Sequence, residues 1–136
     1  MWYTNRKIFK IPMNDPAIAI NVSTRYLANH PLDEPDKYPF AYQITIVNNS
    51  NETVQLINRC WLITDGNGKT SEVQGSGVVG KQPTLAPGED FQYSSGAIID
   101  TPVGSMQGFY EMKKADGSMF KVNINVFRLA VPHAVN

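Results

Sequence analysis

The sequence predicts an all-β protein, a sandwich of seven to eight antiparallel strands. Apolar and polar residues alternate with a period of two in several short segments, as they do in half-buried strands. Clusters of Asn, Asp, Gly and Pro separate these segments, and no segment shows the apolar repeat of an amphipathic helix. The chain has 136 residues, which is the length of one domain. An immunoglobulin-like or fibronectin type III-like β-sandwich fits these features best.

The first half of the chain contains three expected strands and the start of a hairpin. Residues 18–26 and residues 40–46 both alternate between apolar and polar side chains. Toward the end of residues 53–64, odd-numbered and even-numbered positions are both apolar, which predicts either a bulge or a strand covered on both faces. The Asp-Gly-Asn-Gly sequence at 65–68 predicts a tight turn, because these residues accept positive φ at low cost. Residues 69–74 should return antiparallel to the preceding strand.

The second half contains further short strands separated by turns. Phe91 and Tyr93 follow a proline-glycine turn and should lie on one face of a strand. In order after them we expect a loop at 101–108, a strand at 109–112, a hairpin turn at 115–118 and a last strand with Phe120, Val122, Ile124 and Val126 on one face.

The chain divides into one domain and two short ends. Residues 1–16 have a mixed composition that ends at Asp15-Pro16, and we interpret them as an N-terminal extension that could add an edge strand. Residues 17–131 form the β-sandwich domain. Residues 132–136 are expected to form a C-terminal tail.

The composition excludes several classes of protein. Lys and Arg number 12, as do Asp and Glu, so no net charge attracts nucleic acid or an anionic membrane. A single cysteine excludes an internal disulfide and is too few for a thiolate zinc site. No stretch has the length and apolar content of a membrane span or a secretory signal. We therefore expect a cytoplasmic protein that binds neither nucleic acid nor a membrane.

A glycine-rich segment at residues 75–83 matches the dinucleotide fingerprint in the wrong context. That fingerprint requires a helix after the glycines, whereas Pro83 and Pro87 follow here. Successive backbone N–H groups in such a loop can bind an anion, and a lysine can add positive charge. The same glycines can equally serve the architecture by permitting positive φ and close backbone approach. The candidate binding residues in this segment are Gly75, Gly77, Gly80, Lys81 and Gln82.

The predicted loop at residues 101–108 supplies a second set of candidates. This loop is also glycine-containing, and Thr101, Gly104 and Ser105 are its candidate residues. We expect the two loops to lie close together and to bind either a phosphate-bearing small molecule or a protein partner.

Metal and catalytic chemistry have weaker support. The one cluster that resembles hard-metal ligands, His30, Asp33, Glu34 and Asp36, matches no metal motif and suits a solvated loop. The candidate nucleophiles Cys60, Ser76 and Ser105 have no base identified by the sequence. We therefore expect no catalytic residues and no cofactor. Of the aromatic residues Trp61, Tyr93, Phe109 and Tyr110, at least two should fill the core and the others could form an exposed patch.

The sequence resembles the ApaG family over residues 18–131. The segments that carry the resemblance are 40–46 (FAYQITI), 59–61 (RCW), 75–83 (GSGVVGKQP), 85–88 (LAPG) and 101–112 (TPVGSMQGFYEM). The resemblance implies a fibronectin-like sandwich and an association with cobalt and magnesium tolerance and with dinucleoside polyphosphate metabolism. Related domains in eukaryotic proteins act as interaction modules, and the family brings no catalytic residue set. Ser76 and Lys81 make this loop less acidic than we expect for relatives, which favours an anion over a cation.

These observations predict a non-catalytic binding or adaptor module. One alternative is an enzyme that acts on nucleotide polyphosphates or pyrophosphate, and another is a direct binder of divalent metals. A homodimer is also plausible, because the edge strands of an open sandwich can pair between chains.

Overall fold

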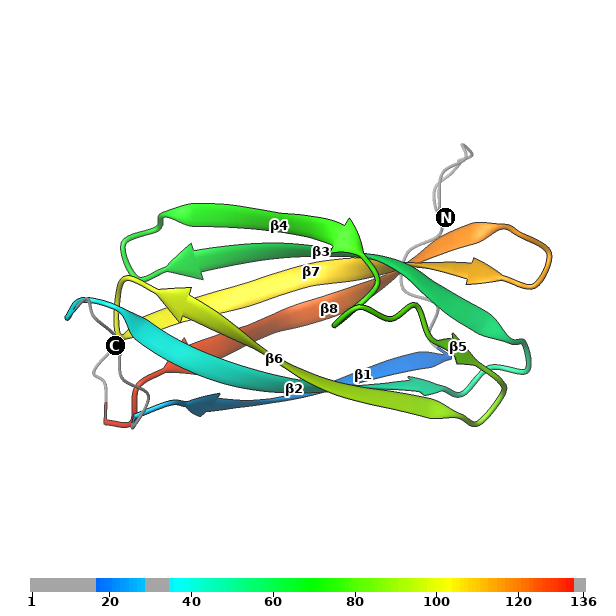
Figure 1. The fold of residues 1–136 in the computed structure, drawn as a ribbon, viewed down its shortest axis with the longest axis horizontal. Coiled ribbons are helices and arrows are strands. Elements are labelled where there is room, and N and C mark those ends of the chain that lie inside the picture. The colour runs from blue at the N-terminus through cyan, green and yellow to red at the C-terminus, as the bar shows by residue number, and fades with distance from the viewer. Residues whose placement is uncertain (1–16, 29–34, 134–136) are drawn as a thin grey trace, which may run out of the picture.

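Two antiparallel sheets face each other in the computed structural model, which describes residues 17–28 and 35–133 (Figure 1). One sheet has the strand order β1-β2-β6, and the five-stranded sheet has the order β4-β3-β7-β8, with β5 paired to β3. No described residue is helical, so these residues include no helix long and apolar enough to span a membrane. The predicted all-β sandwich is confirmed. Its strands are β1 (Ile18–Tyr26), β2 (Tyr38–Asn48), β3 (Val54–Asp65), β4 (Thr70–Ser76), β5 (Thr84–Leu85), β6 (Asp90–Ile99), β7 (Val103–Lys114) and β8 (Met119–Ala130).

The core lies between the two sheets and is built by the alternation seen in the sequence. In β2, the inward positions Phe40, Ile44 and Ile46 are fully buried, and β7 and β8 contribute Met112 and Val122 from the opposite sheet. Burying such side chains stabilises a fold by about 1.5 to 3 kcal/mol each. The continuous inward rows explain why the strands form two layers.

Aromatic residues join the two layers near the middle of the sandwich. Tyr42 of β2 meets Trp61 of β3 edge-on, with ring centroids 5.5 Å apart. The hydroxyl groups of Tyr93 and Tyr110 lie 2.5 Å apart and form a buried hydrogen bond across the sheets. Trp61, Tyr93 and Tyr110 thus belong to the core, whereas Phe109 is only partly buried.

Register shifts determine where the simple alternation fails. A shift between Leu56 and Asn58 places a bulge in β3, which is one of the two alternatives that the sequence offered, although the bulge lies before the apolar run at the end of the strand. A second shift lies between Met106 and Gly108 of β7, where two residues of β8 oppose one of β7. The expectation that Val126 faces inward is wrong: the extra residue turns it outward, where it is 62% exposed.

The structure corrects one expected loop and confirms one expected hairpin. The loop expected at 101–108 is wrong from residue 103 onward, because Val103 already pairs with Ala130 and begins β7. The hairpin expected at 65–68 is confirmed: the Asp65 carboxylate accepts the N–H groups of Asn67 and Lys69, and Gly68 has a φ of 84°. The possible edge strand within residues 1–16 lies outside the described residues.

Candidate functional site

The glycine loop, residues 77–83, is a compact turn rather than a wide loop. Gly75 and Ser76 still belong to β4, so the loop starts at Gly77. Val78 and Lys81 exchange two backbone hydrogen bonds of 2.8 and 2.9 Å, and the two residues between them both have positive φ. That combination defines a type I′ turn, in which Val79 has a φ of 43° and Gly80 a φ of 79°.

Side chains of β3 hold the glycine loop through its carbonyl groups. The Arg59 guanidinium donates hydrogen bonds of 3.1 and 2.9 Å to the carbonyl oxygens of Ser76 and Gly77. Gln55 donates to the Gln82 carbonyl, and the Gln82 amide donates in return to the carbonyl of Ile57. The loop is therefore fixed against the sheet by reciprocal hydrogen bonds.

The backbone N–H groups needed for an anion site are partly engaged within the protein. The Gly77 N–H donates to the Ile57 carbonyl at 2.8 Å, and those of Val78 and Lys81 donate to each other's carbonyls. The Val78 side chain is only 1% exposed and belongs to the core. The side chains of Lys81 and Gln82 are exposed. These contacts give Gly77 a clear architectural role.

The second set of candidates lies at the other end of the five-stranded sheet. Gly104 and Ser105 pair with Asp65 and Thr64, whereas Gly75 pairs with Arg59. Arg59 and Asp65 are six positions apart on β3, which is about 20 Å along a strand. The expectation that the two glycine-containing segments lie close together is wrong, because β3 runs the length of the sheet between them.

Thr101 and Gly104 both have structural contacts at this end. The Thr101 hydroxyl accepts the N–H of Gly66 at 2.7 Å and donates to the Val103 carbonyl at 2.8 Å. A Cβ on Gly104 would lie 2.6 Å from the Thr64 carbonyl oxygen, so glycine is required for the strands to approach.

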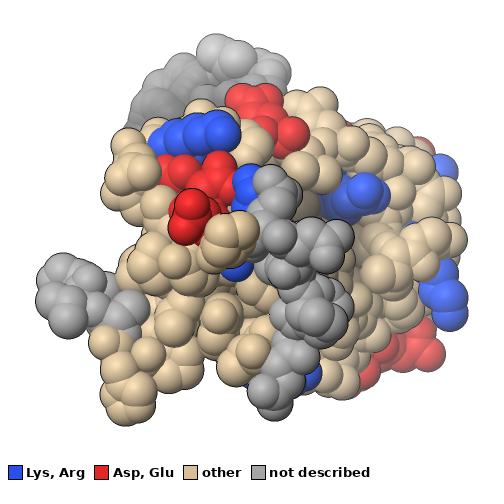
Figure 2. Space-filling model, turned by 60° about the vertical axis from the view of Figure 1, so that its left-hand side comes forward, with Lys and Arg blue, Asp and Glu red and all other residues tan. Residues whose placement is uncertain are grey.

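Charged residues at the same end neutralise one another. Asp100 lies between Lys37, at 2.5 Å, and Lys69, at 3.4 Å. The hydrogen bond from Lys37 is the main reason that the pKa of Asp100 lies below its usual value. In Figure 2, which turns this end forward, acidic and basic side chains adjoin rather than forming separate patches. Among the described residues, the charges at this end are of both signs and form no field of one sign that could attract a charged ligand.

Of the four metal candidates, only Asp36 lies within the described residues. His30, Asp33 and Glu34 lie outside the described residues, and Asp36 is exposed in a turn. Within residues 17–28 and 35–133, no group of three or more His, Cys, Asp or Glu side chains could hold a metal ion.

The outer face of the five-stranded sheet carries a surface hollow of about 440 Å³, which we call the Cys60 hollow. Its apolar part comes from Cys60, Leu62 and Phe109, and its polar part from Glu72, Gln74, Gln107 and Asn123. The Lys121 ammonium lies 4.4 Å from the centre of the Phe109 ring, which places a cation over the aromatic face. Burial raises the pKa of the Cys60 thiol, and the nearby Glu111 carboxylate raises it further. Both effects disfavour the thiolate, which is the nucleophilic form of a cysteine.

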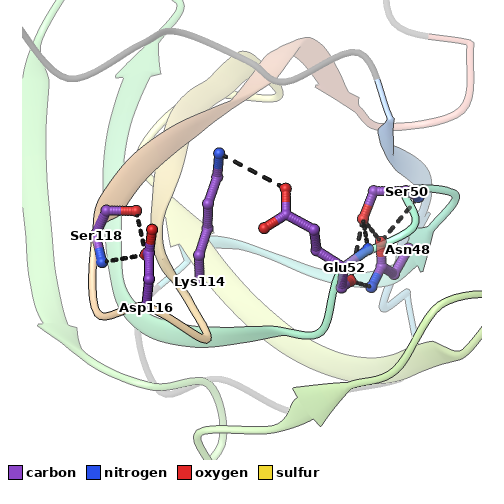
Figure 3. Close-up of polar contacts among 6 residues, drawn as sticks. All are labelled: Asn48, Ser50, Glu52, Lys114, Asp116 and Ser118. Atoms are coloured by element: carbon purple, nitrogen blue, oxygen red, sulfur yellow. Dashed lines mark hydrogen bonds and ion pairs between the residues drawn. The ribbon is translucent and has the colours of Figure 1, made fainter.

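Sequence reasoning missed Asn48. Among the described residues, it is the one polar or charged residue that is fully buried outside the aromatic and apolar core. Its amide donates to the Glu52 carbonyl, and its carbonyl accepts the N–H and hydroxyl of Ser50 (Figure 3). The amide also donates to the carbonyl of Leu85. All of its hydrogen-bonding capacity is used, so Asn48 joins β2 to the turn after it and to β5. In the sequence, residues 48–51 are one of the polar clusters that separate the expected strands, and this local pattern does not reveal a contact with Leu85, which lies 37 residues further along the chain.

Comparison with known proteins decides the family. Residues 28–114 match the ApaG domain family, which is more than half of the chain. The chain belongs to the ApaG family. It is 51% identical over 124 residues to Protein ApaG of Escherichia coli, covering 91% of this chain and 99% of that protein. Protein ApaG of an Enterobacter species is also 51% identical, over 120 residues, with 88% of this chain and 96% of that protein covered.

Solved structures agree with the ApaG assignment. The crystal structure of the putative ApaA protein from Bordetella pertussis superimposes with a TM-score of 0.82 at 40% identity, covering 92% of this chain and all of that one (100%). An X-ray structure of a Northeast Structural Genomics Consortium target gives a TM-score of 0.84 at 46% identity, covering 89% and 92% of the two chains. The resemblance drawn from the sequence segments is confirmed.

Proposed function

We propose that this ApaG-family chain is a non-catalytic, cytoplasmic interaction module that recognises a protein partner through the Cys60 hollow. The observation that carries the proposal is the concave surface itself. Phe109 and Leu62 present apolar area on the outer face of a sheet, and polar side chains surround them. Partly buried aromatic residues inside a polar rim are typical of protein interfaces.

The glycine loop supports a protein partner more than a phosphate ligand. Three of its N–H groups already donate within the protein, and the Arg59 guanidinium donates to the carbonyls of Ser76 and Gly77. The exposed Lys81 then acts as a single surface charge. An association with cobalt and magnesium tolerance or with dinucleoside polyphosphates would be indirect, exerted through the partner.

The same geometry supports the absence of catalysis. The Cys60 thiol has a raised pKa, and Ser105 lies within the paired strand β7. Within the part of the chain that the structure describes, the one histidine is His133, and it forms no hydrogen bond with Cys60 or Ser105 of the kind that activates a nucleophile.

Site-specific photocrosslinking in cells tests the proposed surface. A photoreactive amino acid in place of Leu62 should give discrete crosslinked products with a partner protein. The matched control is Gln43, which is exposed on the outer face of the other sheet and should give none. Phe109→Asp in the Leu62 probe protein should reduce the yield at least tenfold, because it places a charge at the apolar centre. Equal crosslinking from both faces would overturn the proposal.

Calorimetric titration tests the phosphate and enzyme alternatives directly. Pyrophosphate and a dinucleoside tetraphosphate, each with and without Mg²⁺, should give no saturable heat and no product. Saturable heat that disappears in Lys81→Ala would instead assign an anion site to the glycine loop.

A further inference from the structure

Among residues 17–28 and 35–133, strand β4 forms a free edge of the five-stranded sheet. Within these residues it pairs only with β3, and in Figure 1 it is the outermost strand of that sheet, with no other labelled element beyond it. Residues 70–74 are all exposed, and the Val73 side chain is 39% exposed. The opposite side of the sandwich differs, because β1 and β8 contact each other there. Edge strands are commonly protected by lysine, proline or a bulge, and β4 contains none of these.

The hydrogen bonds at its two ends show which backbone groups of β4 are directed outward. The Asp65 N–H donates to the Lys69 carbonyl at 2.9 Å, and the Gly77 N–H donates to the Ile57 carbonyl at 2.8 Å. The register between these two bonds is uninterrupted. Since bonding alternates along an antiparallel strand, odd-numbered residues of β4 face β3. Thr70, Glu72, Gln74 and Ser76 therefore direct their N–H and C=O groups away from the sheet.

We propose that two copies of this chain associate through β4, antiparallel, with the two-fold axis at Val73. In this register Glu72 of each copy lies opposite Gln74 of the other, and their outward backbone groups form the hydrogen bonds. Each Glu72 carboxylate then meets an amide that can donate to it. The two Val73 residues form a non-hydrogen-bonded pair, in which side chains approach most closely.

Other registers fit less well. Centring the pair on Glu72 would place two carboxylates opposite each other, which is destabilising. Centring it on Gln74 would shorten the paired length, because β4 ends at Ser76 and Gly77 begins the turn. The Val73 register pairs residues 70–76 over their full length.

The dimer extends one continuous sheet through both copies. A two-fold axis at Val73 runs perpendicular to the sheet, so both Cys60 hollows lie on the same outer face. Glu72 and Gln74 line each hollow, and the partner's β4 would adjoin them. The dimer does not require the proposed partner-binding function, and it can form without it.

Charge variants at Gln74 test the register by analytical ultracentrifugation. The unmodified protein should show a reversible, concentration-dependent dimer. Gln74→Glu places two carboxylates opposite each other in both symmetric pairs and should weaken association at least tenfold. Gln74→Lys should instead strengthen it several-fold, and added salt should reduce that gain. Circular dichroism confirms that each variant folds. A protein that stays monomeric at every concentration, or equal effects of both variants, would overturn the proposal.

Disulfide trapping provides a test independent of affinity. In a non-hydrogen-bonded pair the Cα atoms lie about 4.5 Å apart, within disulfide range. In a Cys60→Ser background, Val73→Cys should form a covalent dimer rapidly under mild oxidation. Val126→Cys is the matched control, because Val126 is more exposed but lies on β8. Equal trapping at both positions would contradict the β4 interface.

Discussion

The glycine loop and the free edge of β4 adjoin in sequence and differ in what their backbones leave available. In the loop, N–H groups of Gly77, Val78 and Lys81 donate internally, and its carbonyls hold Arg59 and Gln55. Along β4, alternate residues direct both N–H and C=O outward. The loop is the more conspicuous motif in the sequence, yet the plain strand beside it has more backbone groups without a partner among the described residues. A binding site requires groups that the fold has not already paired.

The glycines within the loop repeat this contrast on a smaller scale. A Cβ on Gly77 would lie 2.3 Å from the Lys81 carbonyl oxygen, whereas a Cβ on Gly80 would have no neighbour within 4 Å. Both residues have positive φ. Only Gly77 is required by close packing.

The largest expected effect comes from Gly77→Ala, with Gly80→Ala as its control. Gly77→Ala should lower the free energy of unfolding by about 3 kcal/mol or more, because left-handed backbone strain adds to a backbone clash. Gly80→Ala should cost about 1 kcal/mol, from the positive φ alone. Urea denaturation measures both values. Equal, small losses would show that the loop is not held as tightly as its contacts indicate.

Asn48→Ala tests the buried hydrogen bonds that join β2 to the turn after it and to β5. Removing this side chain leaves the buried Leu85 carbonyl without its amide donor and should cost about 2 to 3 kcal/mol. Asn49→Ala is the control, because Asn49 is exposed and its backbone bond to the Ala17 carbonyl survives. Thermal unfolding monitored by circular dichroism should show a loss for Asn48→Ala only.

Alkaline pH should destabilise the fold through the buried pair of Tyr93 and Tyr110. Burial raises the pKa of Tyr110 and Tyr93 above the ordinary value of 10.0. As pH rises above about 10, the unfolded chain ionises these tyrosines first, so stability is present below that pH and is lost above it. Urea midpoints measured between pH 8 and 11.5 should fall. The Tyr93→Phe, Tyr110→Phe double variant should fall less steeply, and an equal slope would contradict this account.

Glu72→Gln should have the smallest effect on stability and sharpens the contrast with the loop. Glu72 is exposed on the free edge, so its replacement should change the unfolding free energy by less than about 0.5 kcal/mol. A loss above about 1 kcal/mol, measured in urea at a concentration where the protein is monomeric, would show that β4 is not simply a free edge.

Strand and turn positions followed from local patterns, and their exceptions arose from contacts between distant strands. The alternation in residues 40–46 and the turn at residues 65–68 were predicted because each depends on neighbouring residues. The inward placement of Val126 failed because the β7–β8 register shift turns it outward. Residues 103–108 were mistaken for a loop because their glycines are required by packing against β3, which the local pattern does not reveal.

The candidate site was less accessible from sequence than the fold. The glycine motif was visible, but whether its N–H groups are available depends on Ile57 and Arg59, which lie on another strand. The Cys60 hollow combines residues from β3, β4, β7 and β8 that share no sequence motif.

By itself, the sequence determined the all-β class, the main turns and the membership of the ApaG family, because these depend on side-chain periodicity, local φ preferences and residue identity. Only the tertiary structure decided that the two glycine-containing segments lie at opposite ends of β3, and that β4 is an open edge. Each backbone group must find its partner across a sheet, and the register between strands far apart in the chain determines which groups remain unpaired.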